Sequence, residues 1–427
     1  MEFGFAVLLG VFGLVYGLII VRNIKGFSIP IWASMTIGAG LVLVLGAISP
    51  QQAISAINFD VILFLLGMFV LVSGLESSGM LAHITNKILG RAKTPNQVLF
   101  VVVFVMGILS AFLINDTIAL VATPIVIGLA KPMNLRPAPL LIALAFGITI
   151  GSMMTPMGNP QNLLVSLHSG MDFPVLTFFR YLFLPTMTSL TVTYFVLKRF
   201  YKKEFLQATM PTISQNLVLD QKLAKRSSIL IVITIVGFFA IGLVKMLGIG
   251  SGLNFAHVAI FGGIAMLAIG TKRVQIIRGI NWQILVFFVA MFVFVQGLLN
   301  GGIIHAMQDL IPLKPAPGSQ FSTIDIIGTS VSLSQLVSNV PFVAIYLPIM
   351  QSYGFSSTDT ISWIALASAS TIAGNLTILG AASTIIILQV AEKKNGSSFS
   401  FMEFFKIGSI ITITNVLILM FFLIILR

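Results

Sequence analysis

The chain has 427 residues, of which 57% are hydrophobic and only 8% charged, and its formal net charge is +12. A soluble domain does not need this much apolar surface, and several apolar runs exceed the roughly 20 residues that span a bilayer. The absence of cysteine excludes disulfides, thiolate metal sites and cysteine nucleophiles, and the four histidines show no metal-ligand spacing. The composition therefore predicts a polytopic membrane protein with no metal centre and no cofactor.

Apolar runs predict the helices of the chain, and two of these runs are interrupted. Runs 97–130 and 319–350 contain polar residues near their centres, Asn115 to Thr117 in the first and Ser338-Asn339 in the second. Polar backbone at membrane depth is tolerated only where it lines a cavity, so each run is predicted to be a re-entrant hairpin of two half-length helices. The other helices are expected at about 3–21, 28–48, 60–80, 138–168, 174–197, 228–247, 253–271, 282–301, 361–390 and 403–426.

The first run indicates a retained helix and not a signal peptide. It follows Glu2 instead of a basic segment, and it ends without a small-residue cleavage site. The basic residues of the whole chain lie at the ends of apolar runs and do not form one patch with interleaved aromatic residues. The expected surroundings are therefore a lipid bilayer and not nucleic acid.

The sequence contains an internal repeat. Residues 58–80 align without a gap to residues 281–303, and the same offset places Asp116 on Asn339. Further matches follow in the same order along the chain, so the alignment is not a chance match of apolar residues. The chain is therefore predicted to consist of two homologous halves.

We expect an all-α fold made of two inverted-topology repeats, with broken helices at the membrane midplane. The first repeat is residues 1–205, the cytoplasmic linker is 206–226, and the second repeat is 227–427. About five spanning helices and one hairpin in each half give an odd number of crossings, which inverts the second half relative to the first. This architecture is typical of many secondary transporters.

Lysine and arginine predict the orientation of the helices. When the six basic loops, among them Lys87–Lys93 and the polar segment 198–226, are taken as cytoplasmic, the outer loops hold only isolated basic residues such as Lys245 and Lys314. We therefore expect a multi-pass protein of the plasma membrane whose linker faces the cytoplasm.

A second polar interruption occurs in each half. Segments 151–162 and 373–384 carry prolines, glycines and small residues that do not sustain a regular helix. Opening a helix in the bilayer frees carbonyl groups that suit Na⁺ and amide groups at helix N-termini that suit an anion. We expect the two hairpin tips and the two breaks to meet and form a site for a small ion. Its candidate residues are Asn115, Asp116, Thr117, Thr155, Gly158, Asn159, Ser338, Asn339, Asn375, Thr377 and Gly380.

Asp116 is the candidate for energy coupling. A carboxylate in hydrocarbon costs several kcal/mol, so it is normally kept for an ion or substrate path. A carboxyl group that is neutral when empty and ionised when paired suits a carrier of H⁺ or an exchanger of H⁺ for Na⁺. Glu76 is also near an apolar run, but it aligns with Leu299 in the repeat, so we expect it at a helix end.

The tip and break motifs resemble those of the ion transporter superfamily, which includes arsenite permeases, citrate transporters, divalent anion/sodium symporters and certain Na⁺/H⁺ antiporters. The similarity is strongest to the arsenite permease branch, through FLINDTIALVATPIVI at 112–127. In the symporter branch each tip carries Ser-Asn-Thr, whereas here Val340 lacks the hydroxyl and Asp116 adds a charge, which favours coupling through a titrating carboxyl group. The resemblance implies a scaffold of the first three helices of each half, a mobile transport unit and a homodimer.

The expected function is secondary active transport and not catalysis. The expected substrate is a small inorganic or organic anion, such as an arsenite-like oxyanion or a carboxylate, moved with an H⁺ or Na⁺ gradient. The alternative is a Na⁺/H⁺ antiporter that exchanges ions at Asp116. An ion channel also has re-entrant hairpins, but its pore usually lies on an oligomer axis, whereas here both halves carry equivalent interruptions. No nucleotide-binding loop occurs, so ATP drive would require a separate ATPase subunit.

Overall fold

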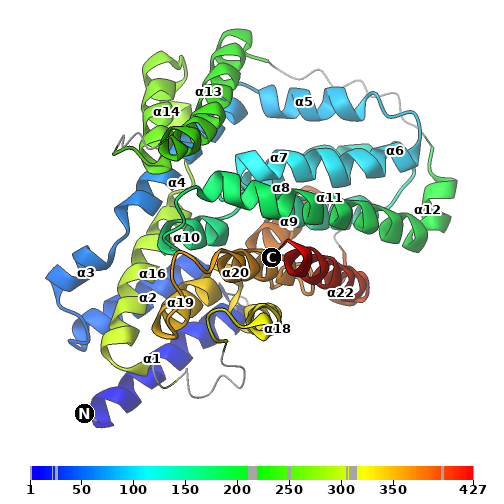
Figure 1. Cartoon of the computed structure of the whole chain (residues 1–427). Helices are drawn as coiled ribbons and strands as arrows, with labels where there is room; N and C mark the ends of the chain where they lie inside the picture. The colour runs from blue at the N-terminus through cyan, green and yellow to red at the C-terminus, as the bar shows by residue number, and fades with distance from the viewer. Residues whose placement is uncertain are drawn as a thin grey trace.

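The computed structural model describes residues 2–21, 23–24, 27–209, 219–247, 252–303, 306, 315–395 and 399–426. Within these ranges the chain is helical apart from the loops and one pair of two-residue strands (Figure 1). The predicted all-helical fold is therefore confirmed. The elements are α1 (Glu2–Val21), β1 (Asn23–Ile24), β2 (Phe27–Ser28), α2 (Ile31–Val44), α3 (Pro50–Ala56), α4 (Phe59–Ser77), α5 (Met80–Leu89), α6 (Pro95–Phe100), the π-helical η1 (Val101–Val105), α7 (Met106–Leu113), α8 (Asn115–Ala130), α9 (Pro137–Ser152), α10 (Pro160–His168), α11 (Pro174–Phe200), α12 (Lys202–Gln207), α13 (Gln221–Met246), α14 (Phe255–Ile269), α15 (Arg273–Arg278), α16 (Trp282–Asn300), α18 (Gln320–Val337), α19 (Asn339–Ser352), α20 (Thr360–Ala373), α21 (Ala382–Asn395) and α22 (Phe401–Ile425).

Six helices in the described part of the chain are long and apolar enough to cross a membrane. Six shorter apolar helices accompany them, among them α8, α9 and α20. Of these shorter helices, α8, α9 and α20 adjoin the tips and breaks, whereas α1, α2 and α14 do not. The six long helices are Phe59–Ser77, Pro95–Leu113, Pro174–Phe200, Gln221–Val244, Trp282–Asn300 and Phe401–Ile425.

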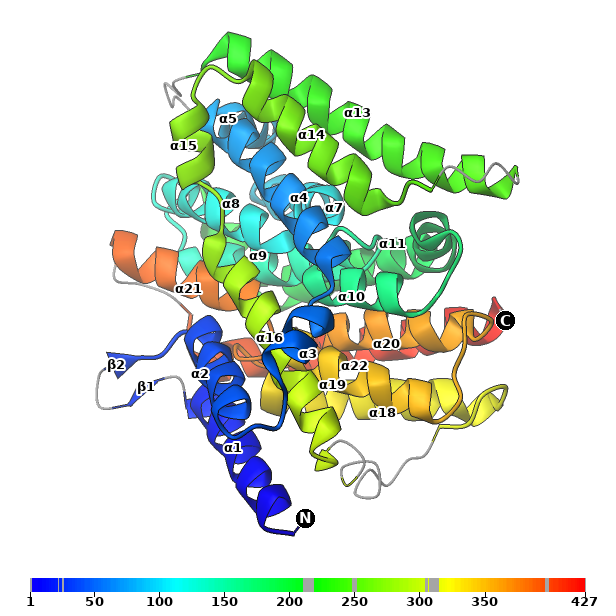
Figure 2. The same ribbon diagram turned by 90° about the vertical axis from the view of Figure 1, so that its left-hand side faces the viewer.

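The two outer ends of the molecule each combine helices from both halves of the chain. Helices α13 and α14 lie beside α4 at one end, and α1 and α2 lie beside α16 at the other (Figures 1 and 2). The contact between α4 and α14 is very close, because a Cβ at Gly67 would lie 2.2 Å from the carbonyl oxygen of Ala259. Small residues permit this approach of two helix backbones, which increases van der Waals contact in a membrane.

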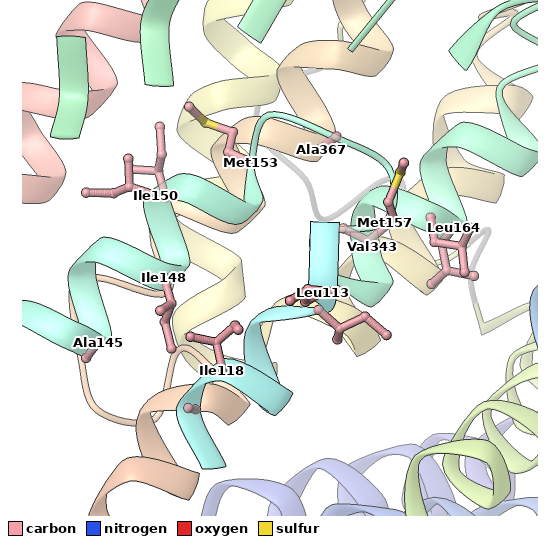
Figure 3. Close-up of a cluster of buried hydrophobic side chains, with 14 of the residues drawn as sticks. Leu113, Ile118, Ala145, Ile148, Ile150, Met153, Met157, Leu164, Val343 and Ala367 are labelled. Atoms are coloured by element: carbon pink, nitrogen blue, oxygen red, sulfur yellow. The ribbon is translucent and has the colours of Figure 1, made fainter. Parts of the chain in front are cut away.

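The middle of the molecule holds the interrupted helices. Helices α7 to α11 of the first half pack there against α18 to α22 of the second half (Figure 2). Buried apolar side chains from both halves fill this region, including Ile118 from α8, Val343 from α19 and Ala367 from α20 (Figure 3). The breaks are therefore surrounded by a continuous apolar core.

The helices are interrupted at the predicted positions. Helix α7 ends and α8 begins at Ile114, and α18 ends and α19 begins at Ser338. Both residues adopt a positive φ, 64° at Ile114 and 71° at Ser338, which is unusual for residues other than glycine. The similar backbone conformation at the two positions indicates one type of turn used twice.

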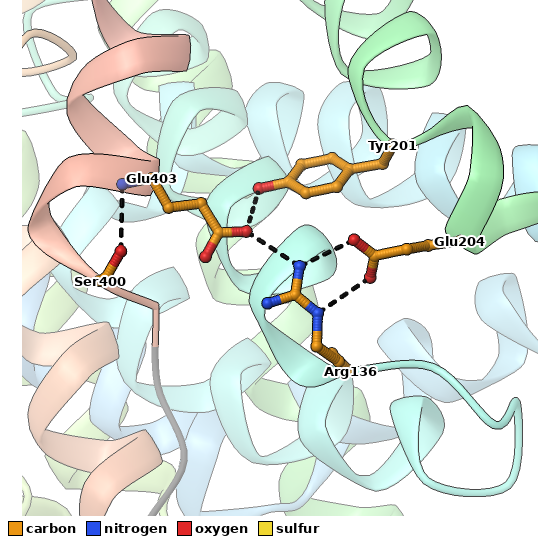
Figure 4. Close-up of polar contacts among 5 residues, drawn as sticks. All are labelled: Arg136, Tyr201, Glu204, Ser400 and Glu403. Carbon is orange, nitrogen blue, oxygen red and sulfur yellow. Dashed lines mark hydrogen bonds and ion pairs between the residues drawn. The ribbon is translucent and has the colours of Figure 1, made fainter.

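An ion-pair cluster fastens the ends of several helices beside the linker (Figure 4). The Arg136 guanidinium, at the start of α9, donates to Glu204 of α12 at 2.7 Å and to Glu403 of α22 at 3.1 Å. Tyr201 also donates to Glu403, at 3.0 Å. The hydrogen bond to Glu204 is the main reason why the pKa of Arg136 is raised above its ordinary value. The cluster joins the first half to the second at one face of the protein.

Several short elements were not predicted. Helices α3, α5, α12 and α15 have ten or fewer residues each, and they connect the longer helices or lie at their ends. Helix α5 is amphipathic, with buried Leu81 and Leu89, so its sequence lacks the long apolar run that identifies a spanning helix. Residues 210–218 of the predicted linker, Lys314 and the Lys245 side chain lie outside the described part of the structure.

Candidate functional site

The tip of the first hairpin is tied to the break between α9 and α10. The Asn115 backbone amide donates to the carbonyl oxygen of Gly158 at 2.9 Å. The hydroxyl of Thr155, in the same break, donates to the carbonyl of Ala111 near the end of α7. Three of the predicted site residues therefore hold the hairpin against the broken helix.

Asn162, which was not among the predicted site residues, organises this break. Its side-chain amide donates to the carbonyl oxygens of Ser152, Met153 and Thr155, at 3.2, 3.2 and 3.0 Å. These carbonyls follow the end of α9 and have lost their helical partners. Asn159 accepts from the Asn162 backbone amide at 2.9 Å and so caps the start of α10. The break is thus an ordered structure with its polar groups satisfied.

Thr371 of α20 connects this network to the second half of the chain. Its hydroxyl oxygen accepts from the Asn159 and Gln161 side-chain amides at 3.2 and 3.3 Å, and it lies 3.1 Å from Asn162 Oδ1. All four side chains are at least 97% buried. Buried polar groups in a fully connected network hold one geometry, so this network fixes the position of α10 relative to α20.

The second tip and break contain fewer polar contacts. The Thr377 hydroxyl donates to Gln335 Oε1 at 3.0 Å, and the Gly380 amide donates to the Thr377 carbonyl at 3.0 Å. Asn339 Oδ1 and Asn375 Nδ2 are buried, and neither has a hydrogen-bond partner among the described residues. Buried amide groups without partners are uncommon in native proteins and often mark a place for water, an ion or a ligand.

A central cavity of about 260 Å³ lies where four half-length helices begin. Asp116 comes from the first turn of α8, Pro160 from α10, Ser338 from the N-terminus of α19, and Ala382 from α21. Helix N-termini carry partial positive charge and unpaired amide groups. The cavity is completed by Ile29, Pro30, Ile31, Trp32, Asn281, Gln283, Ile284, Phe287, Phe288, Val340, Pro341, Ile385, Ile386 and Gln389.

Asp116 is the only charged residue among the described residues that line this cavity. Its side chain is 8% exposed, and it makes no hydrogen bond or ion pair with any residue in the described ranges. A buried carboxylate without a partner is strongly disfavoured, so burial favours a protonated carboxyl group or a bound cation at this position. The cavity therefore combines an electropositive backbone with one group that can change its charge.

The structure separates the predicted site residues into two sets. Asp116 and Ser338 line the central cavity. Thr117 lines a neighbouring cavity, and Asp116 lines this second cavity as well. The other predicted residues belong to the tips and breaks themselves but lie outside both cavities. Asn281 and Gln389, which line both cavities, were not predicted; Asn281 was visible in the aligned segments, because Asn58 occupies the same position in the first half. The predicted residues that line neither cavity are Asn115, Thr155, Gly158, Asn159, Asn339, Asn375, Thr377 and Gly380.

The two tips correspond with a shift of one residue from the sequence alignment. Ile114 and Ser338 share the positive φ, and the helices after them start at Asn115 and Asn339. By backbone position Asn339 therefore corresponds to Asn115, and Val340 corresponds to Asp116. Each turn is a single residue, so the extra residue of the second half lies before its tip, between the aligned segment that ends at 303 and Ser338.

The aligned glycines Gly158 and Gly380 should respond differently to alanine. A Cβ at Gly158 would lie 2.1 Å from the backbone oxygen of Ser152, whereas the nearest atom to a Cβ at Gly380 is 3.0 Å away. We expect Gly158→Ala to abolish transport in proteoliposomes and Gly380→Ala to retain most of it. Size-exclusion profiles would show whether each variant folds. Wild-type transport by Gly158→Ala would contradict the tight break described here.

The fold and the cavity define a class of protein. A polytopic helical bundle with two broken helices, two tight tips and a buried polar cavity is the architecture of a membrane transporter. Two solved transporters share the fold. YdaH of Alcanivorax borkumensis superposes with a TM-score of 0.53 at 14% identity over 98% of this chain and 97% of its own, and MtrF of Neisseria gonorrhoeae with 0.56 at 14% over 98% and 94%.

The chain belongs to the citrate transporter family, whose model matches residues 16–369. It is similar to an uncharacterized transporter of Mycobacterium tuberculosis, with 27% identity over 89% of this chain and 90% of the relative. It is also 25% identical to the silicon efflux transporter of Oryza sativa subsp. japonica, over 91% and 90%, and 23% identical to a putative arsB transporter of Dictyostelium discoideum, over 93% and 88%. The predicted superfamily and the prediction of a membrane transporter are confirmed.

Proposed function

We propose that this protein is a secondary active transporter that moves a small anion or oxyanion together with protons. The observation that carries the proposal is the central cavity, in which four helix N-termini surround one carboxyl group. An anion and an ionised Asp116 would compete for the same partial positive charges. Protonation of Asp116 removes this competition, so anion and proton enter together.

The cavity also suits a weakly acidic hydroxide that is neutral in water. Such a molecule donates hydrogen bonds, which the carbonyl oxygen of a protonated Asp116 accepts, and it accepts hydrogen bonds from helix N-termini. The family is that of citrate transporters, and its relatives include a silicon efflux transporter and an arsB transporter, which suggests citrate, silicon or an arsenite-like substrate. We propose a substrate from these chemical classes, recognised by hydrogen bonds, since the chain has no thiol.

Two inverted repeats would account for the reciprocal packing of the halves. Helices α1, α2, α4, α8 and α10 match α13, α14, α16, α19 and α21 in order and position along each half. Accordingly α4 packs on α14, and α16 packs on α2. We propose that the halves, 1–205 and 227–427, are related by a pseudo-twofold axis in the membrane plane. The homodimer and the mobile transport unit implied by the family resemblance stay predictions.

Cysteine labelling tests the proposed orientation. Gln351 Nε2 donates to the carbonyl of His168 at 3.1 Å, so the segments that follow His168 and Gln351 lie at the same end of the molecule. Single cysteines at the exposed positions Asp172 and Ser352 should react with an impermeant maleimide from outside, and one at Gln207 should react only after permeabilisation. Labelling of Asp172 and Ser352 from opposite faces would contradict the inverted repeats.

Transport assays test the proposed function directly. Proteoliposomes would be offered citrate, arsenite and silicic acid under an imposed proton gradient, an imposed Na⁺ gradient or neither. We expect accumulation of one of these substrates driven by the proton gradient. Sodium-driven proton movement without any of the three substrates would favour the alternative, a Na⁺/H⁺ antiporter.

A further inference from the structure

A second cavity connects Asp116 to the face of the protein beside the linker. It has a volume of about 230 Å³, and its charged lining residues are Asp116 from α8, Glu76 from α4 and Lys393 from α21. Asp116 is buried, whereas Glu76 and Lys393 are exposed, so the carboxyl group of Asp116 lies at the closed end and the other two charges lie at the mouth. The Ser78 carbonyl, just after Glu76, accepts from the Asp220 amide of the segment that leaves the linker, at 3.0 Å.

The interior of this cavity suits water. Ser73, Asn281 and Gln389 contribute polar side chains along the wall, and the volume is large enough for several water molecules. Water between two carboxyl groups provides a hydrogen-bonded path for a proton, because each molecule accepts one proton and donates another. The turn between α15 and α16 contributes Gly279 and Asn281 to the lining, and neither residue titrates.

A matching cavity in the other half shows that Glu76 is not needed to build the space. That cavity, of about 190 Å³, is lined by Phe292, Val295, Gln296 and Leu299 of α16, which align with Phe69, Val72, Ser73 and Glu76 of α4. It also contains His168, but among the described residues that line it there is no carboxylate. Because leucine serves the same position in the second cavity, the carboxyl group at Glu76 has a role other than packing.

We infer that Glu76 is the proton relay between Asp116 and the linker side of the membrane. In each transport cycle the proton leaves the Asp116 carboxyl group, crosses the water of this cavity and is taken up by the ionised Glu76 carboxylate. Glu76 then releases it to solvent and returns to the ionised form, so no other reactant is required. This inference rests on the proposed function, since Asp116 must carry the proton.

The test compares net proton-coupled accumulation with substrate exchange. Proteoliposomes that contain the protein would be loaded with a pH-sensitive dye, and arsenite, citrate and silicic acid would be the transported probes. We expect Glu76→Gln to slow both accumulation and the accompanying proton movement by about tenfold or more. Exchange of labelled for unlabelled substrate should remain near the wild-type rate, because Asp116 keeps its proton during exchange. Glu392→Gln, with the same change on the exposed face of α21, should behave as wild type.

Chemical rescue separates a relay from a structural role. Azide or formate is small enough to enter the cavity and carry protons in place of the missing carboxyl group, so either should restore accumulation by Glu76→Gln. Glu76→Asp should retain most of the wild-type rate. Failure of rescue together with slowed exchange would assign Glu76 a structural role. Full accumulation by Glu76→Gln combined with loss of accumulation by Asp116→Asn would reject the relay alone, whereas full accumulation by Asp116→Asn would reject the proposed coupling.

Discussion

Asp116→Asn is expected to abolish gradient-driven accumulation and to leave substrate exchange measurable. Asparagine has nearly the same size as aspartate, so the cavity keeps its shape. Its side chain is always neutral, which is the state in which the proposed anion enters, but it has no proton to release. The accumulation ratio should therefore fall to the equilibrium value, and the rise of transport rate with external acidity, between about pH 8 and pH 5, should disappear.

The measurement is initial uptake against pH, with and without an imposed proton gradient, for wild type and variant. Asp172→Asn is the matched control, because Asp172 is exposed and lines none of the cavities described above. A variant Asp116→Asn that retains a wild-type pH profile and full accumulation would assign coupling to another group. Uptake that becomes independent of pH but still follows a Na⁺ gradient would show that Na⁺, and not the carboxyl proton, drives transport.

The central cavity holds one carboxyl group in either register of the tips, since neither Asn339 nor Val340 is acidic. Val340, which corresponds to Asp116 by backbone position, lines the same central cavity. Two carboxylates in a space of about 260 Å³ would repel each other, and one would stay protonated throughout the cycle. A single acidic residue gives the cavity one change of charge, which suits transport with one proton.

The helices were predictable because membrane helices require long apolar runs, and the breaks were predictable because polar residues interrupt those runs. Asp116 was visible for the same reason, as one charge within a long apolar run. The cavity lining was less accessible, since Trp32, Phe287 and Gln389 resemble ordinary helix residues in sequence. Only the packing of α2, α16 and α21 around the tips brings them together.

The role of Glu76 was not predictable for a related reason. Its alignment with Leu299 indicated a helix end, and the structure indeed places it in the last turn of α4. The sequence alone does not show that α4, α8 and α21 line one cavity. The polar network around Asn162 was not predicted, because an asparagine in a broken helix is typical of an ordinary loop. Its partner Thr371 also lies more than two hundred positions away in the sequence.

Asn162→Leu is expected to lower stability and to stop transport. The substitution preserves approximate volume but removes the donors to three buried carbonyl groups and leaves the Thr371 hydroxyl with fewer partners. Unsatisfied buried groups cost about 1–3 kcal/mol each, while hydrogen bonds inside membranes often contribute less, so we expect a total loss of about 3 kcal/mol. The melting temperature of the purified protein should fall by a few degrees.

Ser166→Ala is the control for this prediction. Ser166 lies one turn further along α10 and is equally buried, but its hydroxyl donates only to the Leu163 carbonyl of its own helix, at 2.8 Å. Its loss should change the melting temperature little. A double-mutant cycle of Asn162→Leu with Thr371→Val should give a coupling energy of about 0.5–2 kcal/mol, because the two side chains share one network. A coupling energy near zero would show that the network does not join the halves.

The second half supplies a reason why this network should also be required for transport. The residues that align with Thr371, Gln161 and Asn162 are Thr149, Ser383 and Thr384, and their hydroxyl groups are buried without a hydrogen-bond partner in the described part of the structure. The first break is therefore held by amide side chains, whereas the second has only short hydroxyl side chains in the same places. If one break must stay fixed while the other rearranges around substrate, Asn162→Leu should reduce the transport rate far more than Thr384→Val, when both are measured at equal amounts of folded protein.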